Sequence, residues 1–303
     1  LYDQLGPVEP QSGLDSIQLL GENMALLYEG DSLTAQFKNG KQVLLDQDWN
    51  YSLLVPQTYI QTGAPALHDF FMLSNSKKYR KVYNEFGREI LSATFNEVVA
   101  LDPNMLRLQK RNAAIADSTG HYLVRFVYDG IGSNDQGYVS LLDRGKFGEL
   151  NPAKGINIPP SYDKLIKPYS DTVLVATEGQ YKGFINTQNE VLTAFEFDEV
   201  QYFNDSIALV RIEDEWLLEN IRNEEILYEF IEDFEIIDVG EEDKTLFINT
   251  ETGQGIFSET LGEVVEPTFT YIRILGTQRD PIYFAVKLVD EADIYVVIYY
   301  DKK

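Results

Sequence analysis

The chain repeats one pattern of about 35 residues along most of its length, and this repeat limits the folds open to it more than any other feature. One copy, Gly145 to Leu165, reads GKFGELNPAKGINIPPSYDKL, and another, Tyr181 to Val200, reads YKGFINTQNEVLTAFEFDEV. Periods of roughly 20 to 50 residues are typical of solenoids, propellers and other repeat architectures. We therefore expect one small unit that is used many times.

Two independent markers keep the same order along the chain. The first is the position of Gly148, which has equivalents at Val43, Lys81, Ala114, Gly183, Leu217, Gly255 and Val296. The second is an aromatic residue followed by Asp or Asn, found with some decay at 13–17, 57–61, 94–98, 127–131, 161–165, 196–200, 229–233 and 268–272. Eight members in each series predict about eight units.

The local pattern inside a unit is that of strands. In one copy, four short β-prone runs are separated by turn-forming residues such as TQN and NDS: Tyr181 to Asn186, Glu190 to Phe195, Asp198 to Phe203 and Ile207 to Ile212. Apolar positions at helical spacing are hard to find over 10 or more residues, and most connections are too short for a crossover helix. The sequence predicts an all-β chain of four-stranded antiparallel units.

The aromatic-Asp element has a structural explanation. Its ring can pack against the neighbouring unit, while the acid or amide that follows can accept hydrogen bonds from backbone amides at a turn. We expect Asp129, Asp163 and Asp198 to form joints between units, in preference to a catalytic role.

Such units can close into a ring or form an open stack. The chain starts within one unit, at Leu14-Asp15, and ends after the first strand of another, at Ile294 to Tyr300. A ring can use this offset, because a blade shared by both termini removes exposed sheet edges. The favoured prediction is a β-propeller of eight blades with the last blade shared; the alternative is an open β-solenoid or stacked hairpins. Residues 1–13 are expected to be a flexible leader, and 14–303 a single β-repeat domain.

The stretch Gly145 to Asp163 resembles the WG repeat family, bacterial β-rich repeats named for a Trp-Gly pair. The motif is degenerate here: Phe147 and Lys182 stand at the Trp position, and Trp216 is followed by Leu217 in place of Gly. The resemblance implies a repeat architecture and a bacterial source. It implies no activity, cofactor or catalytic residue.

Composition excludes several classes of function. The 49 acidic and 25 basic residues give a net charge of −24, which opposes binding to nucleic acids or anionic lipids. There is no cysteine, so a thiolate site or disulfide is absent, and the longest apolar run is far too short to span a bilayer. The polar leader could tether the domain to a removed N-terminal anchor. We expect an extracytoplasmic location, periplasmic or cell-surface, in a bacterium.

The sequence contains no recognisable catalytic or metal-binding motif. The two histidines, His68 and His121, are expected to be surface residues without a role. The loop Asp129 to Gly137 has oxygen ligands but lacks EF-hand spacing, so calcium is a weak possibility and no cofactor is predicted. Two carboxylates placed in a central channel could still hydrolyse a glycoside, which keeps a carbohydrate-active hydrolase as the alternative function.

The strongest local anomaly is the stretch Glu213 to Asp243, which holds 14 acidic residues and one base, Arg222. Its apolar members Trp216, Leu218, Ile226, Phe230 and Ile236 are expected to face the core. The candidate binding residues are the acids that would project from the other side: Glu224, Glu225, Glu232, Asp233, Glu241, Glu242 and Asp243. This face could dock a basic partner or simply be solvated, and the basic spot Lys77 to Lys81 is interpreted as balancing local acids.

The leading hypothesis for function is a non-enzymatic binding or interaction scaffold that displays loops to a protein or glycan partner. A module whose repeats serve folding alone is a third hypothesis, besides the hydrolase. The sequence names no ligand.

Overall fold

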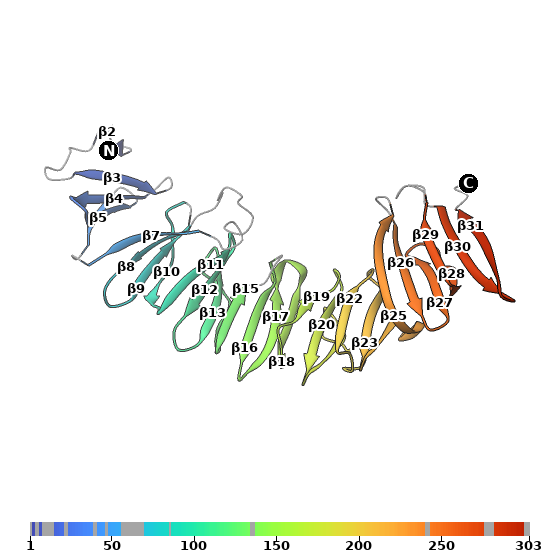
Figure 1. Cartoon of the computed structure of the whole chain (residues 1–303). Helices are drawn as coiled ribbons and strands as arrows, with labels where there is room; N and C mark the ends of the chain where they lie inside the picture. Colours follow the sequence, from blue (N-terminus) through green and yellow to red (C-terminus); the bar gives the residue numbers. More distant parts are fainter. Residues whose placement is uncertain are drawn as a thin grey trace. The chain divides into compact units, whose positions relative to one another are not determined.

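The computed structural model describes residues 2–3, 6–7, 15–20, 24–38, 41–45, 48–55, 70–84, 86–133, 137–239, 243–275 and 282–299 (Figure 1). Most of them lie in short strands, and the described residues include one single-turn 3-10 helix, Pro152–Lys154. The prediction of an all-β chain is confirmed. The chain divides into two compact units, Leu1–Gly155 and Ile156–Lys303. That residues 14–303 form a single domain stays a prediction.

The first unit is built from sheets in which each strand pairs with the next one in the chain. The first two sheets are β3 to β6 (Ser16–Leu20, Met24–Glu29, Ser32–Lys38, Lys41–Leu44) and β7 to β10 (Asn50–Leu54, Phe70–Ser74, Tyr79–Tyr83, Glu89–Thr94). The next two are β11 to β14 (Glu97–Asp102, Met105–Gln109, Ala113–Asp117, Tyr122–Tyr128) and β15 to β18 (Gly130–Ser133, Val139–Asp143, Lys146–Asn151, Ile156–Tyr162), with β18 falling in the residues of the second unit. The predicted four-stranded unit is confirmed in these sheets. Within the predicted leader, β1 (Tyr2–Asp3) pairs with β2 (Gly6–Pro7).

The second unit continues the same order with less regular sheets. A three-stranded sheet contains β19 to β21 (Lys167–Pro168, Val173–Glu178, Tyr181–Asn186), and a seven-stranded sheet contains β22 to β28 (Glu199–Tyr202, Ile207–Ile212, Glu215–Asn220, Glu225–Val239, Asp243–Thr250, Gly253–Ser258, Gly262–Phe269). The last sheet contains β29 to β31 (Tyr271–Ile274, Ile282–Val289, Ala292–Tyr299). The long strand β25 belongs to two consecutive repeats of the second unit. Its residues up to Ile231 pair with β24, and those from Ile231 onward pair with β26.

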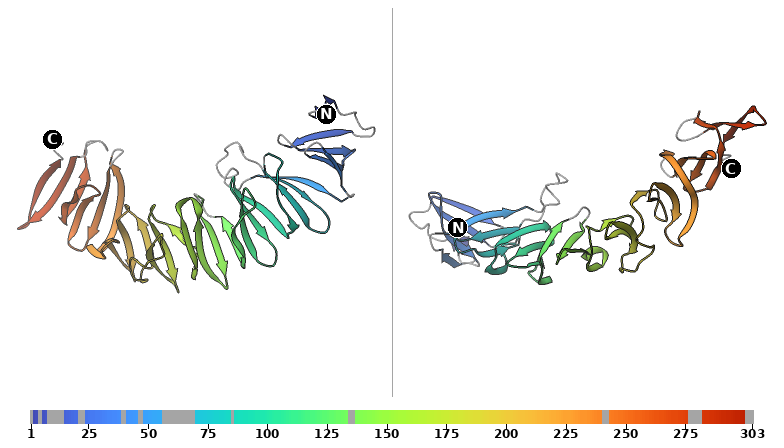
Figure 2. Two further views of the ribbon diagram at one scale, coloured as in Figure 1. Left: turned by 180° about the vertical axis from the view of Figure 1, so that it is seen from behind. Right: turned by 60° about the horizontal axis from the view of Figure 1, so that its bottom comes forward.

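Within each of the two compact units, the sheets follow one another in chain order (Figure 2). Apolar layers between successive sheets form the core of each compact unit. Strand β8 shows how the sequence builds two layers at once. Because side chains alternate along a strand, Met72 enters the layer shared with the third sheet while Leu73 enters the layer shared with the first. An internal strand is therefore apolar on both faces.

The aromatic-Asp elements lie at the corners between successive sheets. Phe95-Asn96 is the whole connection between β10 and β11, and Asp129 alone separates β14 from β15. The Asp129 carboxylate accepts a hydrogen bond from the Arg144 backbone N–H at 2.8 Å, which fixes the hairpin turn between the second and third strands of the next sheet.

The same bond recurs in the second unit, where the Asp163 carboxylate accepts from the Gly179 N–H at 2.7 Å. The Tyr162 ring packs against Phe195, with ring centroids 5.9 Å apart. These contacts support the predicted joint, and they give Asp129 and Asp163 a structural use.

The boundaries of the units differ from the predicted ones. The runs Tyr181–Asn186 and Ile207–Ile212 are strands as expected, but the corner at Phe197-Asp198 places them in successive sheets. The run from Glu190 to Phe195 forms no strand, because residues 191 and 197 make only isolated bridges to β21. Each repeat therefore begins at its aromatic-Asp element.

The Gly148 series marks the third strand of each repeat, with one exception. Val43 lies on the fourth strand, β6, so this member was misplaced. The aromatic member at 57–61 lies outside the described residues, and β7 already begins before it, at Asn50. The longer connection between β7 and β8 caused the error, because it breaks the regular period.

Candidate interaction surfaces

The predicted acidic face is divided between two ends of its hairpins. Strand β24 runs from Glu215 to Asn220, and Glu224 and Glu225 follow it at its far end, where Glu225 pairs with Asn220. The chain then returns along β25, so Ile231 pairs with Trp216. Glu232 and Asp233 consequently lie at the opposite end from Glu224 and Glu225.

We define the acidic edge as five exposed residues at this returning end: Glu213, Asp214, Glu215, Glu232 and Asp233. In the part of the chain that is described, none of them has a basic side chain within ion-pair distance. Of the other candidates, Glu241 and Glu242 lie outside the described residues, and Asp243 begins β26. That these acids bind a partner stays a prediction.

The apolar side of the same stretch is only partly in the core. Trp216, Leu218 and Ile236 belong to or pack against the layer around Ile231, as expected. Ile226 and Phe230 are 47% and 54% exposed, so their predicted burial is wrong. The register of β25 shifts opposite Leu218–Glu219, and Phe230 has a φ of 56°, which together break the alternation of faces.

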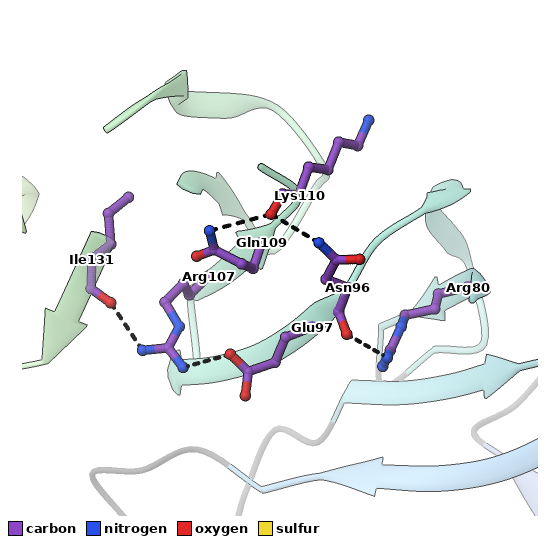
Figure 3. A network of polar contacts seen from close by, with 7 residues as sticks. All are labelled: Arg80, Asn96, Glu97, Arg107, Gln109, Lys110 and Ile131. Carbon is purple, nitrogen blue, oxygen red and sulfur yellow. Dashed lines mark hydrogen bonds and ion pairs between the residues drawn. The ribbon is translucent and has the colours of Figure 1, made fainter. Parts of the chain in front are cut away.

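A basic surface in the first unit is centred on the corner residue Asn96 (Figure 3). The Lys78 ammonium lies 3.4 Å from the Asn96 side-chain oxygen, and the Asn96 amide donates to the Lys110 carbonyl at 2.9 Å. Arg80 donates to the Phe95 and Asn96 carbonyls at 3.1 and 2.8 Å. The hairpin turns of two successive sheets are thereby brought side by side.

We call Lys77, Lys78, Arg80, Lys110 and Arg111 the basic ridge. All but Arg80 are exposed, and none has a carboxylate within ion-pair distance among the described residues. Nearby, Arg107 is neutralised by Glu97 at 3.0 Å (Figure 3). Lys77 and Lys78 do not balance local acids in the way the sequence interpretation supposed.

Lys110 and Arg111 were missed by that interpretation, although a signal existed. They follow Lys77 and Lys78 by one unit, at a spacing of 33 residues, and both pairs occupy the turn between the second and third strands. The Lys110 ammonium also lies 5.1 and 4.7 Å from the ring centroids of Phe95 and Phe126. Comparing charges at equivalent turns would have joined the two basic pairs.

Glu149 is a buried acid in a position that other units fill with apolar side chains. It follows Gly148 on the third strand of its sheet; the fully buried equivalents are Val82, Ile115, Phe184, Leu218 and Ile256. Neither carboxyl oxygen of Glu149 has a hydrogen-bond partner in the described structure. Burial raises the pKa of the Glu149 carboxyl to about 8, so the group is mainly neutral at pH 7.

Glu219, on β24, is a second acid of this kind. Burial, together with the nearby charges of Glu196 and Glu224, raises its pKa to about 7. Paired carboxylates of raised pKa are what a glycoside hydrolase would need.

Metal binding is a separate question. The described residues contain no group of three or more His, Cys, Asp or Glu arranged to hold a metal ion.

The remaining sequence candidates have local contacts. His121 is exposed, and its Nδ1 lies 2.8 Å from the Thr119 hydroxyl, within a turn held by Asp117. His68 lies outside the described residues, as do Asn134, Asp135 and Gln136 of the proposed calcium loop. Asp129, at the start of that loop, is engaged at its joint. No helix in the described residues is long and apolar enough to cross a membrane.

Comparison with protein families identifies the repeat. Residues 183–216 match the WG containing repeat, so the resemblance suggested by the degenerate motifs is found in this segment. The match runs from Gly183 to Trp216, which is one unit length. A search of curated proteins found no match.

Several solved structures resemble the chain weakly. Hsv2 of Kluyvelomyces marxianus is 9% identical, with 96% of this chain and 98% of that chain covered and a TM-score of 0.28. The dihydro-heme d1 dehydrogenase NirN is 10% identical, with 98% and 77% covered and a TM-score of 0.29. PorZ, a surface component of the type-IX secretion system of Porphyromonas gingivalis, is 9% identical, with 95% and 46% covered and a TM-score of 0.24. Scores this low support no statement on fold or function.

Proposed function

We propose that the chain is a non-enzymatic interaction scaffold that presents its hairpin turns to a protein or glycan partner. The supporting observation is the residue choice at the turns between second and third strands. Gly30 and Gly179 occupy such turns with φ of 60° and 62°, a conformation that suits glycine. Lys78 and Glu213 occupy equivalent turns with φ of 60° and 56°.

A left-handed backbone costs a non-glycine residue about 1 kcal/mol. Charged side chains at these turns therefore stand against the local backbone preference, and no ion pair compensates Lys78 or Glu213 in the described structure. The fold itself asks only for a tight turn. The exposed charges of Lys78 and Glu213 are kept despite this cost. Such charges suit a docking surface, because they raise the rate and specificity with which a partner binds.

The test uses the protein and three variants as baits in a native extract at low salt. One variant neutralises the ridge (Lys77→Gln, Lys78→Gln, Lys110→Gln) and one the acidic edge (Glu213→Gln, Asp214→Asn, Glu215→Gln). The matched control changes Glu251→Gln and Glu266→Gln, two exposed acids of the same sheet that lie outside both surfaces. We expect a bound protein or glycan to be lost from one turn variant and kept by the control. Identical retention by all four baits, or none above background, would contradict the proposal.

We further infer that the sheets of each unit follow one another as the open stack that was the alternative prediction. In a propeller blade the fourth strand lies outermost and the first innermost, so each connection crosses three strand spacings, about 14 Å. Only Asp129 separates β14 from β15, and only Thr270 separates β28 from β29. The two Cα–Cα steps across one intervening residue reach about 7 Å, which is too short for that crossing.

Small-angle X-ray scattering tests the arrangement. A compact ring of this length has a radius of gyration of about 19 Å. We expect the measured radius and distance distribution to differ from those of a closed ring. A compact, symmetric distribution at about 19 Å would restore the eight-bladed propeller with its shared blade.

The proposed setting is extracytoplasmic and bacterial, and its support is the resemblance to WG repeats. The hydrolase alternative keeps one specific observation in its favour, which is the raised pKa of Glu219 beside Glu196 and Glu224. The absence of a recognised catalytic motif in the sequence favours the scaffold.

A further inference from the structure

The basic ridge is an isolated positive surface on a strongly negative protein. Residues 77–125, which form most of two successive sheets, contain nine basic and five acidic residues. The rest of the chain contains 16 basic and 44 acidic residues. A random scatter of lysines would not explain a positive region that coincides with two stacked hairpins.

Hydrogen bonds hold parts of the basic ridge in place. Asn96 contacts both the Lys78 ammonium and the Lys110 carbonyl, and Arg80 is spent on the carbonyls of the same corner. Since Arg80 is occupied, the groups that remain for a ligand are the ammonium groups of Lys77, Lys78 and Lys110 and the guanidinium of Arg111. Three of these are point charges, which suit several separate carboxylates better than one bidentate anion.

The acidic edge offers such carboxylates at the equivalent place of another unit. Its members Glu213 and Asp214 occupy the turn between second and third strands, as Lys77-Lys78 and Lys110-Arg111 do in the first unit, and Glu215 begins the third strand. Glu232 and Asp233 flank the next corner, as Asn96 does in the ridge. Both surfaces are exposed and unneutralised, so four free basic groups on the ridge face five free carboxylates on the edge, and the two surfaces are opposite in charge.

We propose that the basic ridge of one copy binds the acidic edge of a second copy of this chain, so that copies associate head to tail. This inference rests on the proposed scaffold function and names one partner for it. The interface is heterologous: a dimer still presents a free acidic edge on one copy and a free ridge on the other. Association therefore continues beyond the dimer as concentration rises.

Ionic strength gives this interface a recognisable signature. Copies of net charge −24 repel one another at very low salt, where the screening length reaches about 30 Å. At about 0.15 M salt the screening length is about 8 Å, so distant charges no longer act while contacting charges still do. Association should be strongest at intermediate salt and weaker at both extremes, whereas apolar association would strengthen toward high salt.

Sedimentation velocity on the full chain tests the proposal through complementation. The ridge variant carries Lys77→Gln, Lys78→Gln, Lys110→Gln and Arg111→Gln; the edge variant carries Glu213→Gln, Asp214→Asn, Glu215→Gln, Glu232→Gln and Asp233→Asn. Each variant alone should stay monomeric, because it lacks one of the two surfaces. An equal mixture should form a 1:1 complex that does not grow further. Control variants, Arg88→Gln with Arg125→Gln and Glu251→Gln with Glu266→Gln, should associate as the unaltered chain does.

The outcomes separate this inference from the scaffold function. An unaltered chain that stays monomeric across the salt series overturns self-association, and so does a mixture of the two variants that forms no complex. If the chain is monomeric but poly-glutamate binds the ridge, the occupant is another polyanion, and the scaffold function survives without this partner. If the controls lose association as fully as the ridge and edge variants, net charge and not these surfaces drives it, which also overturns the proposal.

Discussion

Replacing Glu149 with leucine is expected to stabilise the protein by about 3 kcal/mol at pH 7. Glu149 is fully buried, and both of its oxygens lack hydrogen-bond partners in the described structure. Its pKa is about 8 in the folded protein, against 4.5 for an ordinary glutamate. A carboxyl that must take up a proton to be buried makes folding less favourable at any pH where the unfolded chain has lost it.

The pH dependence has a definite sign. Below pH 4.5 the carboxyl is protonated in both states, and burial carries no proton cost. As pH rises from 4.5 to about 8, the unfolded chain ionises while the folded chain stays neutral, so stability falls by about 1.4 kcal/mol per pH unit. Above pH 8 the loss levels off. The leucine variant lacks this slope, so its advantage should grow across that pH range.

Urea unfolding at pH 5, 7 and 8.5 measures the effect. Glu149→Gln should remove the slope while keeping an unpaired polar group, and should therefore gain less than Glu149→Leu. Glu29→Gln, an exposed acid of the first sheet, serves as the control and should leave both stability and slope nearly unchanged. A Glu149→Leu protein whose stability follows pH in parallel with the unaltered chain would show that Glu149 is ionised when folded.

Local alternation and turn chemistry predicted most of the strands, because they depend on neighbours in the chain. Tyr181–Asn186 and Ile207–Ile212 were read correctly as strands, and the aromatic-Asp joint was read correctly at Asp129 and Asp163. The grouping of strands into sheets was not, because it depends on where the chain turns a corner. Strand β25 leaves one repeat and enters the next at Ile231, within the aromatic member at 229–233, while the strand itself runs on without interruption.

The candidate surfaces were harder to predict, because they combine residues from different units. Lys78 and Lys110 come from the turns of two successive sheets, and both contact Asn96, a residue between them in the sequence. Glu149 looks like an exposed strand residue when its own strand is read alone. Its position is recognised as apolar only when the repeats are aligned, because Val82 and Phe184 occupy the equivalent position in other repeats. In both cases alignment of the repeats contains the information that local pattern lacks.

Replacing Gly255 with alanine is expected to destabilise the protein by about 2 to 3 kcal/mol. Gly255 stands at the glycine position of the repeat, on the third strand β27. The fourth strand, β28, shifts register opposite it, and a β-carbon added there would lie 2.9 Å from the Pro267 N and Cα and from the Val265 carbonyl. These are backbone atoms, so no side-chain rotation can relieve the overlap.

The same register shift explains why the repeat favours glycine without always requiring it. Opposite Ala114 and Leu217 the fourth strand also shifts register, yet those repeats accept a side chain. The distance between the third strand and the shifted fourth strand therefore differs between repeats. Gly130→Ala is the matched control, because its added β-carbon would meet only the Leu142 side chain, at 3.6 Å. Thermal and urea unfolding should show a loss for Gly255→Ala and almost none for Gly130→Ala. Equal stability of the two variants would mean that β28 moves freely away from β27, and the close approach of strands would no longer account for the glycine.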